Sequence, residues 1–274
     1  MRRALKRAAF GAADGLYRAK NRGRPRLLVY TDSRGENLAS RLGKTGYGTY
    51  VNRLRSKYQL TYALCPESHT TIVDFLNFMD KRRATAYDAV VMHCGIVDFS
   101  PRPVSGIAKL ERSKADMPRF HDLFASNRAY YAQPFACEYY GERTINLYST
   151  DFLEHQILPE LMALPRLIWI NANHFVPGWD GNYTRGRPAN IDQVVTEFDA
   201  VMQHHLPTVI DIKGAWTPAQ VQQLTIDNVH FTKAGFDKLF GLVDGAVEDI
   251  LGQGRPLPPV ASSEMAAHPH SGPH

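Results

Sequence analysis

Two short and almost unbroken apolar segments constrain the fold of this chain most, Ala89–Cys94 (AVVMHC) and Leu167–Ala172 (LIWINA). A strand with one face in water alternates apolar and polar residues, whereas a continuous apolar run is typical of a strand covered on both faces. Three further segments have strand-like composition: Arg26–Thr31 (RLLVYT), Gln59–Leu64 (QLTYAL) and Thr208–Lys213 (TVIDIK). The sequence therefore predicts a mostly parallel five-stranded sheet with helices on both faces.

Helical patterns fill the gaps between these strands. The expected helices are Glu36–Tyr58, Thr71–Arg83, Asp151–Ala163, Ile191–His205 and Thr232–Leu251. Strands that alternate with helices in this way predict an α/β fold, a three-layer α/β/α sandwich. A chain of 274 residues is long enough to build one such core.

The first 25 residues form a basic segment that we expect to be helical. The chain has a net charge of +5, and much of it lies before residue 27: Arg2, Arg3, Lys6, Arg7, Arg18, Lys20, Arg22, Arg24 and Arg26. One interpretation is a solvated terminal helix. The other is a helix that makes peripheral contact with an anionic membrane surface. Because no aromatic residues are interleaved with the charges and no known nucleic-acid module is present, we expect no nucleic-acid partner.

The remaining organisation follows from composition. The main domain is predicted to span residues 26–251, with residues 99–148, rich in Arg, Tyr and Phe, as an insertion near the site. Residues 252–274 are rich in Pro, Ser and His, which predicts a disordered tail. Three cysteines at scattered spacings give no disulfide or zinc pattern, and the N-terminus lacks the apolar core of a signal peptide. We therefore expect a cytoplasmic protein.

The first motif with chemical potential is Asp32-Ser33-Arg34, directly after the first strand. In open parallel sheets ligands bind beyond the carboxyl ends of the strands. A serine there, followed by a helix, exposes its hydroxyl group, and its backbone N–H can stabilise an oxyanion. The simpler interpretation is that Asp32 and Ser33 only cap the following helix.

The second motif, Asp227–His230 (DNVH), lies just before the last helix. A histidine base needs a carboxylate that holds its tautomer and stabilises the imidazolium. A separation of three residues on a loop lets Asp227 fold back onto Nδ1 of His230, which leaves Nε2 free to face a serine. A chance Asp-x-x-His on a surface loop is the alternative.

The third motif, Gly95–Asp98 (GIVD), follows the third strand. With a strand order of 2-1-3-4-5, the first and third strands are neighbours, so this loop would flank the same crevice as Ser33. Gly95 would allow a close backbone approach. Asp98 would orient the loop or pair with Arg34 or Arg102, and an ordinary turn is the alternative.

Together the three motifs resemble the SGNH, or GDSL-like, hydrolase family. Asp32-Ser33 is similar to the first block of that family, Gly95–Asp98 to its third and Asp227–His230 to its last, over about residues 26 to 251. The resemblance implies a flavodoxin-like sandwich. It also implies that Ser33 is the nucleophile, that His230 is the general base and then the acid, and that Asp227 orients His230.

The sequence departs from the family pattern at the expected oxyanion positions. Thr31 stands in place of the first-block glycine, Val97 in place of an asparagine that donates to the oxyanion, and Cys65–Thr71 contains no glycine. Losing one oxyanion donor costs about 10²–10³ in turnover. We expect Asn173 or backbone N–H groups near Ser68 to replace the missing donors.

Six residues are accordingly predicted to contact the oxyanion or the substrate: Arg34, Gly95, Asp98, Ser68, His69 and Asn173. Further Trp, Tyr and Arg residues fall in loops above the sheet, where they would suit sugars or anionic groups: Trp179, Tyr183, Arg185, Arg187, Tyr139 and Tyr140.

These features favour a serine esterase that removes an O-acyl (acetyl) group from a carbohydrate through an acyl-enzyme. No metal or organic cofactor is required by this chemistry. Two alternatives remain open. A polysaccharide O-acyltransferase would use the same triad, and a catalytically weak SGNH-fold protein would only bind a glycan.

Overall fold

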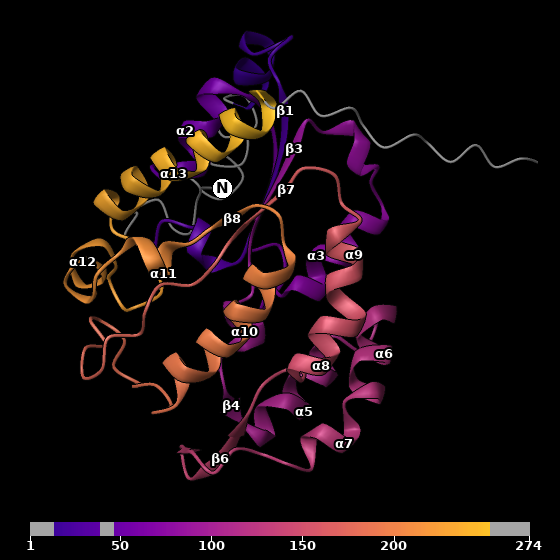
Figure 1. Cartoon of the computed structure of the whole chain (residues 1–274), viewed down its shortest axis with the longest axis vertical. Helices are drawn as coiled ribbons and strands as arrows, with labels where there is room; N and C mark the ends of the chain where they lie inside the picture. The colour runs from indigo at the N-terminus through magenta and orange to yellow at the C-terminus, as the bar shows by residue number, and fades with distance from the viewer. Residues whose placement is uncertain (1–13, 39–46, 253–274) are drawn as a thin grey trace, which may run out of the picture.

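A five-stranded parallel sheet forms the centre of the molecule in the computed structural model, which describes residues 14–38 and 47–252 (Figure 1). The strands are β1 (Arg26–Thr31), β2 (Gln59–Leu64), β3 (Ala89–His93), β7 (Leu167–Ile170) and β8 (Val209–Ile210). They pair in the order β2-β1-β3-β7-β8, every pair parallel. The predicted α/β class and strand order are confirmed. The last strand is shorter than expected because Asp211 caps the next helix instead.

Helices cover both faces of the sheet. On one face, buried side chains of the sheet pack against α2, α11, α12 and α13; on the other they pack against α3, α9 and α10. The bounds are α2 (Tyr50–Lys57), α3 (Ile72–Asp80), α9 (Leu158–Met162), α10 (Ile191–His205), α11 (Ile212–Ala215), α12 (Pro218–Leu224) and α13 (Lys233–Gly252). The result is the expected three-layer sandwich.

The helix expected over Glu36–Tyr58 was predicted too long. Residues 36–38 are not helical, residues 39–46 lie outside the described part, and α2 begins at Tyr50. Gly48 has a φ of 78°, a left-handed conformation that a continuing helix cannot contain, and Thr49 is the N-cap. A glycine turn therefore sets the start of this helix.

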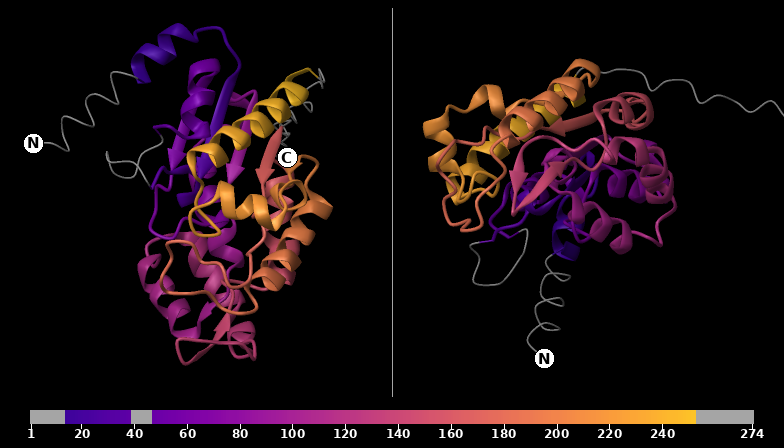
Figure 2. Two further views of the ribbon diagram at one scale, coloured as in Figure 1. Left: turned by 90° about the vertical axis from the view of Figure 1, so that its left-hand side faces the viewer. Right: turned by 90° about the horizontal axis from the view of Figure 1, so that it is seen from below.

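The chain between β3 and β7 forms additional structure at the carboxyl end of the sheet. In the left view of Figure 2 the strand arrows point toward this segment. It contains a small antiparallel sheet in the order β4-β6-β5, together with several short helices. Its elements are α4 (Ile96–Phe99), β4 (Arg102–Pro103), α5 (Val104–Ser113), α6 (Pro118–Ser126), α7 (Arg128–Tyr131), β5 (Glu138–Tyr139), β6 (Glu142–Ile145), α8 (Thr150–Phe152) and the π-helix η3 (Leu153–Ile157).

Residues 14–20 form a helix that is fastened to the edge of the sandwich. Asp14 forms an ion pair with Arg55 of α2, and the amide of Asn21 donates to the backbone carbonyls of Arg55 and Tyr58. Residues 1–13 of the predicted basic segment and residues 253–274 of the predicted tail lie outside the described residues. No helix within the described ranges is both long and apolar enough to cross a membrane.

Candidate active site

Ser33 lies where β1 ends, at the first position of the 3-10 helix η1 (Ser33–Gly35). The backbone N–H of Asp32 donates to the carbonyl of His93 at the end of β3, which ties this turn to the neighbouring strand at 2.9 Å. The Ser33 side chain is half-buried. Its backbone N–H donates to no acceptor in the described residues, so it is available to a ligand.

Arg34, which follows the serine, points into the protein. Its guanidinium forms an ion pair with Asp32 at 3.0 Å and donates to the carbonyl of Asn171 at 2.9 Å. Both partners of the ion pair are almost completely buried. The prediction that Arg34 contacts the substrate is wrong, because the buried Asp32 carboxylate needs a cation to compensate its charge.

Gly35 completes the turn and explains how Thr31 is tolerated in place of a glycine. A Cβ atom on Gly35 would lie 2.2 Å from the Thr31 Oγ1 atom. A glycine at position 35 therefore makes room for the side chain at position 31.

The structure brings His230 onto Ser33, although 197 residues separate them. The Nε2 atom of His230 lies 2.9 Å from Oγ of Ser33, and its Nδ1 atom lies 2.8 Å from a carboxylate oxygen of Asp227. The three side chains thus form one continuous hydrogen-bonded relay. Nucleophile, base and orienting acid stand within hydrogen-bonding distance, as general-base activation of a hydroxyl requires.

The Asp227 carboxylate is held ionised by its surroundings. Burial acts to raise its pKa, but hydrogen bonds from the ring and backbone of His230 and from the backbone of Val229 outweigh burial and lower the pKa below its ordinary value. The two backbone donors reach the other carboxylate oxygen, at 2.7 Å from His230 and 3.1 Å from Val229. Asp227 is therefore a fixed anion that can orient and stabilise an imidazolium.

The loop that carries Asp227 and His230 is braced by the segment that follows β7. Arg187 donates to the Asp227 carbonyl at 2.6 Å, and Asn228, which has a φ of 65°, accepts from the Val176 N–H at 3.0 Å. Gly181 packs so closely that an added Cβ would lie 2.1 Å from the Ile226 carbonyl oxygen. Sequence reasoning did not find these braces, although the Asp180-Gly181 pair is a turn signal.

Asn173 belongs to this bracing and not to the oxyanion site. Its amide nitrogen donates to the carbonyls of His174 at 2.8 Å and Asn228 at 2.9 Å, and the residue is 3% exposed. The prediction that it replaces the missing oxyanion donor is wrong, because two loop carbonyls already occupy its amide hydrogens.

Asp98 and Gly95 are buried and contact other parts of the protein. The Asp98 carboxylate accepts from the N–H of Ile72, the first residue of α3, at 3.1 Å and from the Tyr148 hydroxyl at 2.9 Å. Asp98 is fully buried, so the prediction of a substrate contact is wrong, and it pairs with neither Arg34 nor Arg102. Burial is the largest cause that raises its pKa, to about 8.

Gly95 is also buried and has a φ of 126°. An added Cβ would lie 3.1 Å from the ring of Phe99. A glycine is therefore needed at this turn for its backbone conformation and for close packing, and the ligand contact at Gly95 stays a prediction.

A cleft of about 540 Å³ opens in front of Ser33. The loop after β2, residues 65–70, forms one wall, and Val97 contributes an apolar side chain to another. Ser68 and His69, both predicted to lie near the substrate, line this cleft and are exposed. Their side chains contact each other, with 3.2 Å between Ser68 Oγ and His69 Nδ1, but His69 has no carboxylate partner among the described residues.

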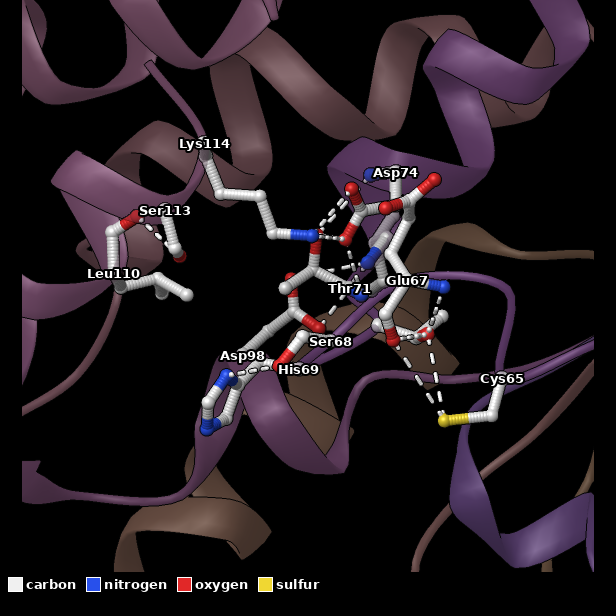
Figure 3. A network of polar contacts seen from close by, with 12 residues as sticks. Cys65, Glu67, Ser68, His69, Thr71, Asp74, Asp98, Leu110, Ser113 and Lys114 are labelled. Carbon is white, nitrogen blue, oxygen red and sulfur yellow. Dashed lines mark hydrogen bonds and ion pairs between the residues drawn. The ribbon is translucent and has the colours of Figure 1, made fainter. Parts of the chain in front are cut away.

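A buried network holds the base of this loop (Figure 3). Thr71 caps α3 reciprocally with Asp74, and Lys114, at the end of α5, forms an ion pair with Asp74 at 2.8 Å. Figure 3 shows Lys114 and Asp74 pointing toward each other behind the loop that carries Ser68. Both charged side chains are almost fully buried, at 2% and 1% exposed. The segment between β3 and β7 is thereby fixed to the wall of the cleft.

The described residues contain no group of three or more His, Cys, Asp or Glu side chains arranged to hold a metal ion. The contacts of Ser33, His230 and Asp227 make their relay the site whose geometry suggests chemistry.

Comparisons with known proteins give structural similarities only. No family model and no curated protein matches the chain. A lipase/acylhydrolase from Enterococcus faecalis is 17% identical, with 85% of this chain and 99% of that one covered and a TM-score of 0.45. A putative acylhydrolase from Bacteroides fragilis is 12% identical, over 83% and 88%, with a TM-score of 0.45. An acetylxylan esterase from Geobacillus stearothermophilus is 17% identical, over 83% and 94%, with a TM-score of 0.38. At these values the likeness assigns no activity.

Proposed function

We propose that this chain is a serine esterase of the SGNH type that removes an O-acyl group from a carbohydrate through an acyl-enzyme. One observation carries the proposal, the continuous relay from Ser33 through His230 to Asp227, with contacts of 2.9 and 2.8 Å. A serine hydroxyl is a weak nucleophile at its ordinary pKa and needs an adjacent base that is itself oriented.

In the first step Ser33 Oγ attacks the ester carbonyl carbon while its proton passes to Nε2 of His230. The Asp227 carboxylate stabilises the imidazolium that forms. When the tetrahedral intermediate collapses, the bond to the sugar oxygen breaks and His230 returns the proton to that oxygen. The sugar leaves with a free hydroxyl group, and the acyl group stays on Ser33.

In the second step water takes the place of the sugar. His230 removes a proton from the water, which attacks the acyl-enzyme, and the acid leaves as Ser33 regains its hydrogen. The unpaired backbone N–H of Ser33 is one oxyanion donor in this proposal. The second comes from the backbone of the loop Ser68–Thr70, whose three N–H groups have no acceptor in the described residues.

Covalent labelling with a fluorophosphonate, read by intact mass and peptide mapping, tests the proposal. We expect one adduct on Ser33, and none in the Ser33→Ala or His230→Ala variants. Ser68→Ala is the matched control, because Ser68 lies in the same cleft beside His69, which has no carboxylate partner in the part of the chain that the structure describes. A folded wild-type protein that forms no adduct, or an adduct on Ser68, would overturn the proposal.

Release of free acetate from an O-acetylated saccharide, with water as the only acceptor, then identifies hydrolysis. Appearance of the acetyl group as a new ester on an added second sugar, with no release of free acetate, would show acyl transfer instead.

A further inference from the structure

A second cleft adjoins the one in front of Ser33. It has a volume of about 490 Å³ and shares the lining residues Ser68 and His69 with the first, so the two clefts lie side by side. Its other walls come from α5, from the β5–β6 hairpin and from the segment that follows β7. An ester carbonyl at Ser33 would therefore leave the alcohol part of the substrate a path past Ser68 and His69 into this second cleft.

The second cleft is positively charged. Lys109, Arg185 and Arg102 line it, and Glu142 is its one carboxylate. Glu142 accepts from the N–H and hydroxyl of Ser105 at 2.9 and 2.7 Å, and the charge of Lys109 also acts on it. Neither Lys109 nor Arg185 forms an ion pair within the described part of the chain. Three cations against one carboxylate leave the lining of this cleft with a net positive charge, which suits an anion.

The same cleft presents a fixed aromatic ring. Tyr140 is 64% exposed, yet its hydroxyl donates to the Arg185 carbonyl at 3.0 Å. Tyr139 packs beside it, with ring centroids 4.3 Å apart, and its hydroxyl donates to the Gly186 carbonyl at 2.8 Å. A ring that is held at its hydroxyl while its face stays open suits the apolar face of a sugar.

We propose that the second cleft binds the alcohol part of the substrate, and that this part is a saccharide bearing a carboxylate. The inference rests on the proposed esterase function. The sugar ring lies on Tyr140, and its carboxylate pairs with Lys109 and Arg185. The guanidinium of the half-buried Arg102, which donates to the Val97 carbonyl, adds to the positive potential of the cleft.

Steady-state kinetics with three esters test this assignment: an O-acetylated galacturonate oligosaccharide, an O-acetylated xylo-oligosaccharide, and 4-nitrophenyl acetate, whose alcohol part has neither a sugar ring nor a carboxylate. In the double variant Lys109→Gln/Arg185→Gln we expect KM for the galacturonate ester to rise about tenfold with kcat unchanged, since each exposed charge pair contributes modestly. The rise should shrink at high salt. The other two esters should keep their KM.

Two further variants sharpen the result. Arg112→Gln/Arg24→Gln removes two exposed cations outside the cleft, one of them on the same helix as Lys109, and should change no KM. Tyr140→Leu should raise KM for both saccharides and leave 4-nitrophenyl acetate unaffected.

The inference would be overturned if the wild type had equal KM values for the acidic and neutral saccharide esters, or if KM were unchanged in the Lys109→Gln/Arg185→Gln variant. Continued hydrolysis of 4-nitrophenyl acetate in that case would leave the proposed esterase function standing. Loss of all ester hydrolysis and of labelling at Ser33 in the wild type would instead refute the esterase function itself.

Discussion

Replacing Asp227 by Asn tests the relay with the least change in shape. The Asp227 carboxylate accepts three hydrogen bonds, one from the His230 ring on one oxygen and two backbone bonds on the other. An asparagine keeps a single acceptor oxygen. Because two backbone N–H groups require an acceptor, the oxygen should stay with them and the new NH₂ group should face the His230 ring.

That orientation forces the wrong tautomer on His230. Nδ1 must then accept a hydrogen bond, so the ring hydrogen moves to Nε2, the atom that lies 2.9 Å from Ser33 Oγ. A protonated Nε2 cannot take the serine proton, and the charge that stabilises an imidazolium is also lost. In serine hydrolases with this relay the same change lowers turnover about 10⁴-fold. That factor corresponds to about 5 kcal/mol of transition-state stabilisation.

The assay is kcat for 4-nitrophenyl acetate at pH 5 to 8, with circular dichroism to verify folding. Asp227 has a pKa below its ordinary value, so the wild-type carboxylate is ionised throughout this range. No pH in it should rescue the Asn variant. Asp237→Asn is the control, because Asp237 is not among the residues that line the cleft and its ion-pair partners in the described residues are the exposed cations Arg53 and Lys233. A folded Asp227→Asn protein with kcat within tenfold of wild type would refute the reasoning.

Three other predictions concern the braces of the site. Gly181→Ala should lower kcat and cost about 1–3 kcal/mol of stability, because its Cβ would meet the Ile226 carbonyl. Gly178→Ala is the control for backbone strain without a clash, because Gly178 also has a positive φ but has open space around it. Equal losses of thermal stability and of kcat in the two variants would contradict this. Burial raises the pKa of Asp98 to about 8, so the folded protein keeps a proton that the unfolded chain releases above about pH 4. As the pH rises from about 4 to 8, the wild type should lose up to about 1.4 kcal/mol of unfolding free energy per pH unit relative to Asp98→Asn. Urea titrations that give both proteins the same dependence of unfolding free energy on pH would exclude this. Lys114→Met should destabilise the fold by about 3–5 kcal/mol, because it leaves its buried aspartate partner unpaired; a loss below about 1 kcal/mol in urea unfolding would show that this pair contributes little.

The sequence alone determined the architecture and where its motifs fall. Continuous apolar runs predicted the buried strands, and helical spacing predicted Ile191–His205 to the residue. These features are local, since hydrophobic periodicity and backbone hydrogen bonding act over a few residues. Because parallel strands end at the same edge of a sheet, the order of the strands also placed the Ser33 and Gly95 loops together. The chain around Gly48 escaped prediction because a glycine turn interrupted an otherwise helical pattern.

Only the tertiary structure decided which polar side chains face the cleft. Arg34 turned inward because the buried Asp32 needed a cation, and the amide of Asn173 donates to the carbonyls of His174 next to it and of Asn228, 55 residues along the chain. The partners of Asp98 and Lys114 likewise lie 26 to 50 residues away in sequence. A buried polar group must find a partner, but which partner is within reach depends on packing that no local pattern contains. Local sequence thus specified the elements, and the pairing of buried charges specified the site.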